Sequence, residues 1–118
     1  MTYDLLVIGG GAGGCFAAIR TAELHHGARI CILESARKPL SKVEISGGGR
    51  CNVTHACFDP EELISYYPRG SKELLGPFYH FQPSDMVDWL SSKGVALKTE
   101  PDGRMFPVTD QSTTIIEC

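Results

Sequence analysis

A glycine cluster near the N-terminus constrains the fold more than any other feature of this sequence. The cluster, GGGAGG over residues 9–14, follows an apolar run over 3–8 and precedes a segment over 12–24 whose apolar residues recur every three or four positions. The run predicts a strand buried on both faces of a parallel sheet, and the periodic segment predicts a helix. A second apolar run, RICILE over 29–34, follows Gly27, a residue type that commonly ends helices. Strand, helix and strand within about 30 residues predict a βαβ unit and an α/β fold of Rossmann type.

The glycines of the cluster have the spacing G-x-G-x-x-G, at Gly9, Gly11 and Gly14. In a dinucleotide-binding loop the first glycine permits a tight turn, the second lets the backbone approach a pyrophosphate, and the third lets helix and strand pack closely. The free N–H groups at the start of the helix face the phosphates. Glu34 stands where an acid accepts hydrogen bonds from the adenosine ribose and repels a 2′-phosphate. The pattern predicts a dinucleotide-binding site. It does not distinguish FAD from NAD as the ligand, and it disfavours NADP.

A second glycine cluster, ISGGGRCN over residues 45–52, lies soon after the predicted βαβ unit. Three successive glycines allow backbone conformations in which N–H groups point into one concavity and bind an anion. Arg50 adds a permanent cation, and Lys42 lies just upstream. A glycine-rich, basic segment of this kind is suited to contact the pyrophosphate of a cofactor, or the ring at the far end of that cofactor. Its composition also fits a flexible linker whose arginine is solvated.

The rest of the chain predicts short helices and one β-hairpin. Residues 36–52 have no sustained period and are predicted to be a long loop with room for one helical turn. Asp59 before Pro60 predicts a helix start, and Thr109 or Asp110 is predicted to cap a last helix. The other predicted elements are helices over 71–75 and 84–93, and strands over 95–100 and 104–108 joined by the turn Pro101-Asp102-Gly103.

Composition is that of one globular domain. The 118 residues are 42% hydrophobic and carry a net charge of −3, which gives no general attraction to nucleic acid or to an anionic membrane. The sequence has neither a long apolar span nor a secretory signal, so we expect a cytoplasmic protein. Its five cysteines include no C-x-x-C pair, and with the four histidines they form no zinc pattern. We expect free thiols, with Cys51 packed in a turn in preference to acting as a redox partner.

The sequence resembles a known family of proteins. The string KVEISGGGRCNVT over residues 42–54 resembles the signature of the BaiN/RdsA type of bacterial flavoproteins, the aminoacetone oxidase-like, NAD(P)/FAD-dependent oxidoreductases. The opening VIGGGAGG, residues 76–100 and GRMFPVTDQS over 103–112 resemble the same family, while His55 stands where its members commonly have asparagine. The resemblance implies an FAD-binding domain, with flavin as the redox centre and NAD(P)H as a candidate electron donor.

The resemblance also implies site residues and boundaries. Family members are longer, so residues 1–118 are expected to be the N-terminal part of an FAD-binding domain, incomplete at the C-terminus and without a whole active site. We divide it into a βαβ unit over 1–34, a glycine-rich cofactor loop over 35–58, and helices with a hairpin over 59–118. The implied cofactor-binding residues are Gly9, Gly11, Ala12, Gly13 and Gly14 in the pyrophosphate loop, Glu34 as the ribose acid, and Lys42, Gly48, Gly49, Arg50, Cys51 and Asn52 in the second loop.

Several interpretations remain open from the sequence. We hypothesise that Arg50, or the backbone N–H groups of Gly48 and Gly49, stabilises negative charge at the N1/C2=O edge of a reduced flavin. The alternatives to a flavoprotein are an NAD-binding Rossmann fragment and a truncated nucleotide-binding module without catalysis. No catalytic residue or substrate is assigned, and the partner we expect is a second copy, bound through an uncovered sheet edge.

Overall fold

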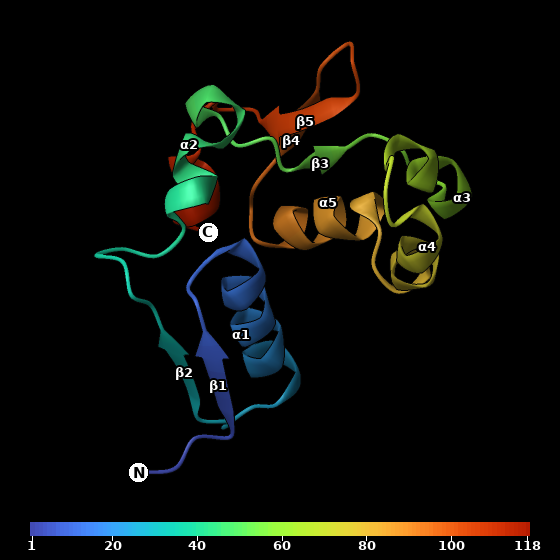
Figure 1. The fold of residues 1–118 in the computed structure, drawn as a ribbon. Helices are drawn as coiled ribbons and strands as arrows, with labels where there is room; N and C mark the ends of the chain where they lie inside the picture. Colours follow the sequence, from blue (N-terminus) through green and yellow to red (C-terminus); the bar gives the residue numbers. More distant parts are fainter.

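The computed structural model describes all residues from 1 to 118 (Figure 1). The predicted βαβ unit is present as β1 (Leu5–Ile8), α1 (Ala12–Leu24) and β2 (Ile30–Leu33). The two strands are parallel, with Leu5 opposite Ile30 and Ile8 opposite Leu33. Helix α1 has the bounds that the sequence predicts, and Gly27 follows it with a φ of +93°. These elements form an N-terminal lobe over residues 1–34.

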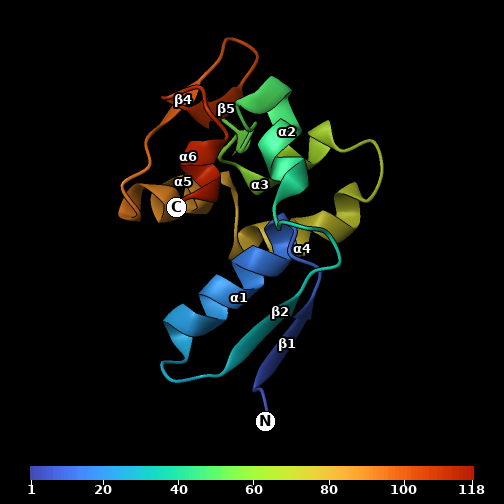
Figure 2. The same ribbon diagram turned by 90° about the vertical axis from the view of Figure 1, so that its left-hand side faces the viewer.

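One face of the β1–β2 sheet is open, contrary to the prediction of strands buried on both faces. Burial alternates along β1, so Leu5 and Val7 are partly buried while Leu6 and Ile8 are 51% and 75% exposed. Leu33, the register partner of Ile8, is 51% exposed as well. The prediction was wrong because α1 covers only one face of these two strands, and no second layer of this chain lies on the other (Figure 2).

Residues 35–40 connect the N-terminal lobe to a C-terminal lobe over 41–118, in which short helices surround a small antiparallel sheet. Its central strand is β5 (Arg104–Pro107), which pairs with β3 (Thr54–His55) and β4 (Leu97–Thr99), so that Thr54 and Thr99 both lie opposite Met105. The predicted hairpin is thus confirmed, and a two-residue strand that the sequence did not predict joins it. The elements of the lobe are α2 (Ser41–Gly49), β3 (Thr54–His55), α3 (Pro60–Leu63), the 3-10 helix η1 (Ile64–Tyr66), α4 (Ser71–His80), α5 (Pro83–Ser92), β4 (Leu97–Thr99), β5 (Arg104–Pro107) and α6 (Thr113–Ile116).

Three local predictions are corrected. The supposed loop over 36–52 contains α2, whose helical backbone breaks where Ser46, Gly47 and Gly48 leave helical φ/ψ values. Helix α4 runs past the predicted end at residue 75 to His80. The proline at 77 inside it removes one backbone donor, and helical hydrogen bonding resumes after it, where the Phe81 N–H donates to the Pro77 carbonyl at 2.9 Å. Neither residue predicted to cap the last helix does so: Ser112 holds the N-cap position of α6, and Asp110 has a φ of +56° in the preceding turn. The Asp59 cap is confirmed, since its carboxylate accepts the Glu61 N–H at 3.0 Å.

The core lies in the C-terminal lobe, between β5 and the helices. Phe106 is fully buried, and Leu90 and Leu63 are 2% and 3% exposed. The molecule is nevertheless elongated, because its radius of gyration of 15.3 Å exceeds the roughly 13.5 Å expected of a compact domain of this length. No helix has the length and apolar character needed to cross a membrane.

The two lobes meet where α1 contacts the segment around α5. The Phe16 ring packs edge-on against Trp89 with 5.0 Å between centroids, and it lies 5.3 Å from the Phe81 ring. Glu23, also on α1, accepts a hydrogen bond from the Trp89 indole N–H at 3.3 Å and forms an ion pair with Lys93. In both ribbon views α1 reaches from the β1–β2 sheet toward α5 (Figures 1 and 2).

Candidate cofactor site

The first and third glycines of the N-terminal motif are required by the geometry of the turn. Gly9 has a φ of +100°, which favours glycine. A Cβ on Gly14 would lie 2.1 Å from the Gly9 carbonyl oxygen and 3.0 Å from Cγ1 of Val7. Only glycine therefore allows α1 to pass this close to β1, which fixes where the helix begins.

The middle glycine leaves the start of α1 open. Gly11 is the N-cap residue, has extended backbone angles, and makes no side-chain cap to the helix. A Cβ built on Gly11 or Gly13 meets no atom within 4 Å, and the first turn of α1 carries no acidic residue. The N–H groups of this turn and the positive end of the helix dipole are thus available to an anionic group. The residues present fit a pyrophosphate.

Glu34 joins the end of β2 to the glycine loop. Its Oε2 accepts the Gly10 N–H at 2.7 Å, and its Oε1 accepts the Ala36 N–H at 2.8 Å. The N–H groups of Ala36 and Gly10 hold the pKa of this carboxyl below its ordinary value, even though partial burial acts in the opposite direction. The side chain is exposed, so an ionised carboxylate with free lone pairs stands beside the loop.

Gly10 is a site residue that the sequence analysis missed. A Cβ at this position would lie 2.9 Å from Cβ of Pro39 and 3.2 Å from Oε2 of Glu34. Its carbonyl accepts the Leu40 N–H at 2.8 Å, which ties the segment before α2 to the loop. The motif leaves this position free, so the only signal in the sequence was the unbroken run of three glycines.

A hollow of about 390 Å³ brings part of the predicted site together. Gly11 and Ala12 of the first loop, the Glu34 carboxylate and Lys42 at the start of α2 all line it. The sequence analysis grouped Lys42 with the second glycine loop, whereas the structure places it beside the first. Lys42 gives this hollow a cation and the helix start gives it donors, so the hollow suits a ligand with phosphate and hydroxyl groups.

The second glycine loop has the unusual backbone that its sequence predicts. Gly47, Gly48 and Gly49 have φ values of +57°, +68° and +90°. A Cβ on Gly47 would lie 2.8 Å from Cε1 of Phe106, so this glycine packs directly on the core. Nothing lies within 4 Å of a Cβ on Gly48 or Gly49. These two glycines form the open side of the loop.

Arg50 has partners within the chain. Its Nη1 donates to Oε1 of Glu100 at 2.8 Å and lies 3.3 Å from Oδ1 of Asp110, and its guanidinium carbon lies 3.8 Å above the Phe106 ring. The hydrogen bond to Glu100, followed by that to Asp110, raises the pKa of the guanidinium against the effect of desolvation. A contact between Arg50 and a cofactor stays a prediction.

Cys51 and Asn52 complete the second loop. Cys51 is 6% exposed with a φ of +63°, and burial raises the pKa of its thiol, which disfavours the reactive thiolate. It is a free thiol packed in a turn, as the sequence predicts.

No three His, Cys, Asp or Glu side chains come together as a metal site.

An apolar cavity of about 220 Å³ lies between the two glycine loops. Ala12 of the first loop and Cys51 and Asn52 of the second line it, together with Trp89 and Leu90 of α5. Ala12 also lines the hollow that contains Glu34, so the hollow and the apolar cavity adjoin at the start of α1. The two adjoining spaces thus bring together part of the predicted set, namely Gly11, Ala12, Glu34, Lys42, Cys51 and Asn52, whereas Gly48, Gly49 and Arg50 line neither.

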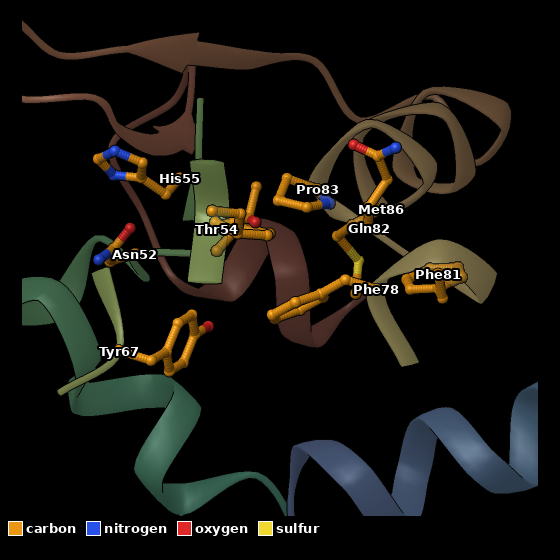
Figure 3. Close-up of a pocket in the computed structure, with 11 residues that line it drawn as sticks. Asn52, Thr54, His55, Tyr67, Phe78, Phe81, Gln82, Pro83 and Met86 are labelled. Atoms are coloured by element: carbon orange, nitrogen blue, oxygen red, sulfur yellow. The ribbon is translucent and has the colours of Figure 1, made fainter. Parts of the chain in front are cut away.

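A further cavity, of about 320 Å³, lies beyond the second loop (Figure 3). Its walls include the aromatic rings of Tyr67, Phe78 and Phe81, and the first two rings lie 5.6 Å apart. Asn52 borders this cavity as well as the apolar cavity. In Figure 3 the Tyr67 hydroxyl points toward the space between Thr54 and the Phe78 ring.

Comparison with known proteins identifies the family. Residues 3–118 match the family described as HI0933-like protein Rossmann domain. The chain belongs to this family. The flavoprotein resemblance expected from its two glycine-rich strings is confirmed, and so is the predicted Rossmann-like α/β class.

Several curated proteins are similar to this chain. It is 31% identical over 104 residues to the ribosomal RNA dihydrouridine synthase of Escherichia coli, a match that covers 88% of this chain and 25% of that protein. It is 30% identical over 111 residues to the 3-dehydro-bile acid delta(4,6)-reductase of Clostridium scindens, covering 94% of this chain and 26% of that protein. The chain therefore spans about a quarter of the length of these relatives.

Proposed function

We propose that this chain is the FAD-binding part of a flavin-dependent oxidoreductase. The observation that carries the proposal is the open start of α1 at Gly11, which faces the same hollow as the Glu34 carboxylate. A pyrophosphate and an adenosine ribose are spaced along a dinucleotide in this order. The carboxylate suits a ribose with two free hydroxyls and repels a 2′-phosphate.

The remaining site residues support FAD in particular. A cofactor whose pyrophosphate lies at Gly11 and Ala12 would have its ring end directed to the adjoining apolar cavity, where Cys51 and Asn52 contribute the far wall. Lys42 would neutralise phosphate charge. Gly48 and Gly49 line neither space, but their side without neighbours leaves room for a ligand to contact the second loop there. When bound, the flavin supplies the redox chemistry, and these residues bind and orient it.

The reaction class is proposed from the relatives' names. One name denotes formation of dihydrouridine in ribosomal RNA, and the other denotes reduction of a bile acid at its delta(4,6) positions. Both describe reduction of carbon–carbon double bonds in rings. We therefore propose that the protein reduces a ring double bond, with NAD(P)H as the electron donor, and that it acts in the cytoplasm.

A titration of the purified chain tests the cofactor. FAD, FMN and NAD⁺ are added separately, and binding is followed by the fluorescence of Trp89, the only tryptophan of the chain. We expect saturable binding of FAD, weaker binding of FMN because it lacks the adenosine that Glu34 would hold, and loss of FAD binding in Gly11→Val. Tighter binding of NAD⁺ than of FAD would favour the NAD-binding alternative. Absence of saturable FAD binding would contradict the proposal for this chain.

A further inference from the structure

Two motifs about 50 residues apart form one structural unit. Arg50, at the end of the second glycine loop, reaches across to Glu100 at the end of β4 and to Asp110 beyond β5. Its planar group lies on the ring of Phe106, which belongs to β5 and is fully buried. The arginine thus uses its Nη1 nitrogen and the face of its guanidinium within the chain.

The anionic partners of Arg50 are themselves held in place. Asp110 pairs with Lys98 of β4 at 2.5 Å in addition to Arg50, and these two cations, Lys98 first, hold the pKa of its carboxyl below the ordinary value. Both carboxylates stand on the segment that forms and follows the β4–β5 hairpin. The hairpin segment therefore holds two carboxylates, of Glu100 and Asp110, and the Phe106 ring in fixed positions around the Arg50 guanidinium.

The backbone of the loop is fixed by the same segment. Gly47 packs on the Phe106 ring, and the Gly49 carbonyl accepts the Ser112 N–H at 2.9 Å. The Ser112 hydroxyl, on a residue only 4% exposed, donates to the Glu44 carbonyl of α2 at 2.8 Å. Contacts to the hairpin segment thus flank Gly48 and Gly49, whose open side has no neighbours.

We infer that Arg50 is a positioning residue, which clamps the second glycine loop to the β4–β5 hairpin through Glu100, Asp110 and Phe106. This inference rests on the proposed function in one respect, namely that the loop contacts the cofactor. It revises the hypothesis that the Arg50 charge acts on the reduced flavin. The guanidinium orients Gly48 and Gly49, and those glycines present the loop to the cofactor.

The first measurement needs no cofactor. Amide hydrogen exchange over residues 46–52 is compared in the unmodified chain, Arg50→Gln, Arg50→Lys, Glu100→Gln and the Arg50→Gln/Glu100→Gln double variant. We expect roughly tenfold faster exchange of the loop in Arg50→Gln and a smaller increase in Glu100→Gln, which leaves Asp110 and Phe106 in contact with Arg50. The double variant should exchange no faster than Arg50→Gln, since the Glu100 contact is already broken there. Arg50→Lys keeps the charge but loses the fork and the stacking, so we expect it to fall between Arg50→Gln and the unmodified chain.

Arg104→Gln is the matched control. Arg104 also lies near the Phe106 ring, at 5.3 Å, but its ion pair is with Asp102 in the hairpin turn. We expect loop exchange in this variant to equal that of the unmodified chain. Circular dichroism verifies that each variant is folded before its exchange is compared.

The second measurement separates positioning from direct charge. We expect Arg50→Gln to weaken FAD binding by roughly tenfold and Glu100→Gln to weaken it in the same direction but less, and we expect both to leave the reduction potential of bound flavin unshifted. A direct charge on the flavin would instead shift the potential in Arg50→Gln and leave loop exchange unchanged, and that result would overturn the inference. Unchanged exchange in Arg50→Gln overturns it as well. If no variant and not even the unmodified chain binds FAD, the proposed function fails, while the exchange measurement still decides whether the clamp exists.

Discussion

The carboxylate of Glu34 accepts a hydrogen bond from the N–H of Gly10 at 2.7 Å, so the acid expected to bind a ribose also holds the glycine loop. A second hydrogen bond from the Ala36 N–H fixes the other carboxylate oxygen. The orientation of the carboxylate is therefore set before any ligand arrives. Preorganisation of this kind reduces the entropy lost on binding.

Gly10→Ala is expected to destabilise the chain without any ligand. The new Cβ would lie 2.9 Å from Cβ of Pro39 and 3.2 Å from Oε2 of Glu34, so the glycine loop or the segment at Pro39 must move. We expect a loss of about 1–3 kcal/mol in the free energy of unfolding, measured with urea. Gly13→Ala is the control, because its Cβ meets nothing within 4 Å inside a helix and should stabilise by up to ~1 kcal/mol. Equal effects of the two substitutions would contradict the predicted contact.

Glu23 is expected to make the contact between the lobes sensitive to acid. The hydrogen bond from Lys93, followed by those from Arg20 and Trp89, lowers the pKa of Glu23 from 4.5 to about 2. Because the folded pKa lies below the unfolded value, the stabilisation is complete above about pH 4.5 and is lost as the pH falls toward 2. Urea unfolding followed by Trp89 fluorescence at pH 6 and pH 3 measures this loss.

In Glu23→Gln we expect a smaller fall in stability between these two pH values, because the neutral amide has no charge to lose. Glu73→Gln, on the exposed surface of α4, serves as the control and should follow the unmodified chain. The assignment to Glu23 would be wrong if both variants kept the full acid dependence.

Ser112→Ala is expected to cost about 1 kcal/mol of stability. The substitution removes a buried hydroxyl that donates to the Glu44 carbonyl at 2.8 Å, while the backbone hydrogen bond from Ser112 to the Gly49 carbonyl remains. Ser92→Ala is the comparison, since its exposed hydroxyl bonds only to Trp89 in the preceding turn of its own helix. Thermal unfolding of the two variants should show a clear decrease for residue 112 and a small change for residue 92.

Cys51 is expected to resist alkylation. Burial raises the pKa of its thiol and limits access to it, whereas Cys118 is exposed. We expect iodoacetamide at neutral pH to modify Cys118 first and Cys51 at least roughly tenfold more slowly, as mass spectrometry of peptides would show. Modification of Cys51 at the rate of Cys118 would reopen a redox role.

The elements predicted well have strong local signals. The period of α1 is continuous over three turns, and the hairpin has Asp102 and Gly103 in its turn between two apolar strands. Glu34 is predicted as the ribose acid from its place at the end of β2 alone, and that role stays a prediction. Patterns of this kind depend only on neighbours in sequence, so they can be recognised without knowledge of the rest of the fold.

The features that sequence reasoning missed depend on distant partners. The exposure of Leu6 and Ile8 depends on which layers cover the sheet, and an apolar run cannot report that. Two-residue β3 exists only because β5 lies beside it. Arg50 and its carboxylates lie 50 and 60 positions apart, and no local signal pairs them. Gly10 was missed because Pro39, which excludes a side chain there, belongs to a later segment.

The narrow contact at Phe16 has a consequence for how the chain unfolds. Each lobe has its own hydrogen-bonded sheet, and few side chains, chiefly Phe16 and Glu23, connect α1 to α5. Cooperativity between two such units is only as strong as the contacts that they share. A dinucleotide that spans the Glu34 hollow and the apolar cavity would touch both units at once. Its binding would turn two weakly coupled folding units into a single cooperative one.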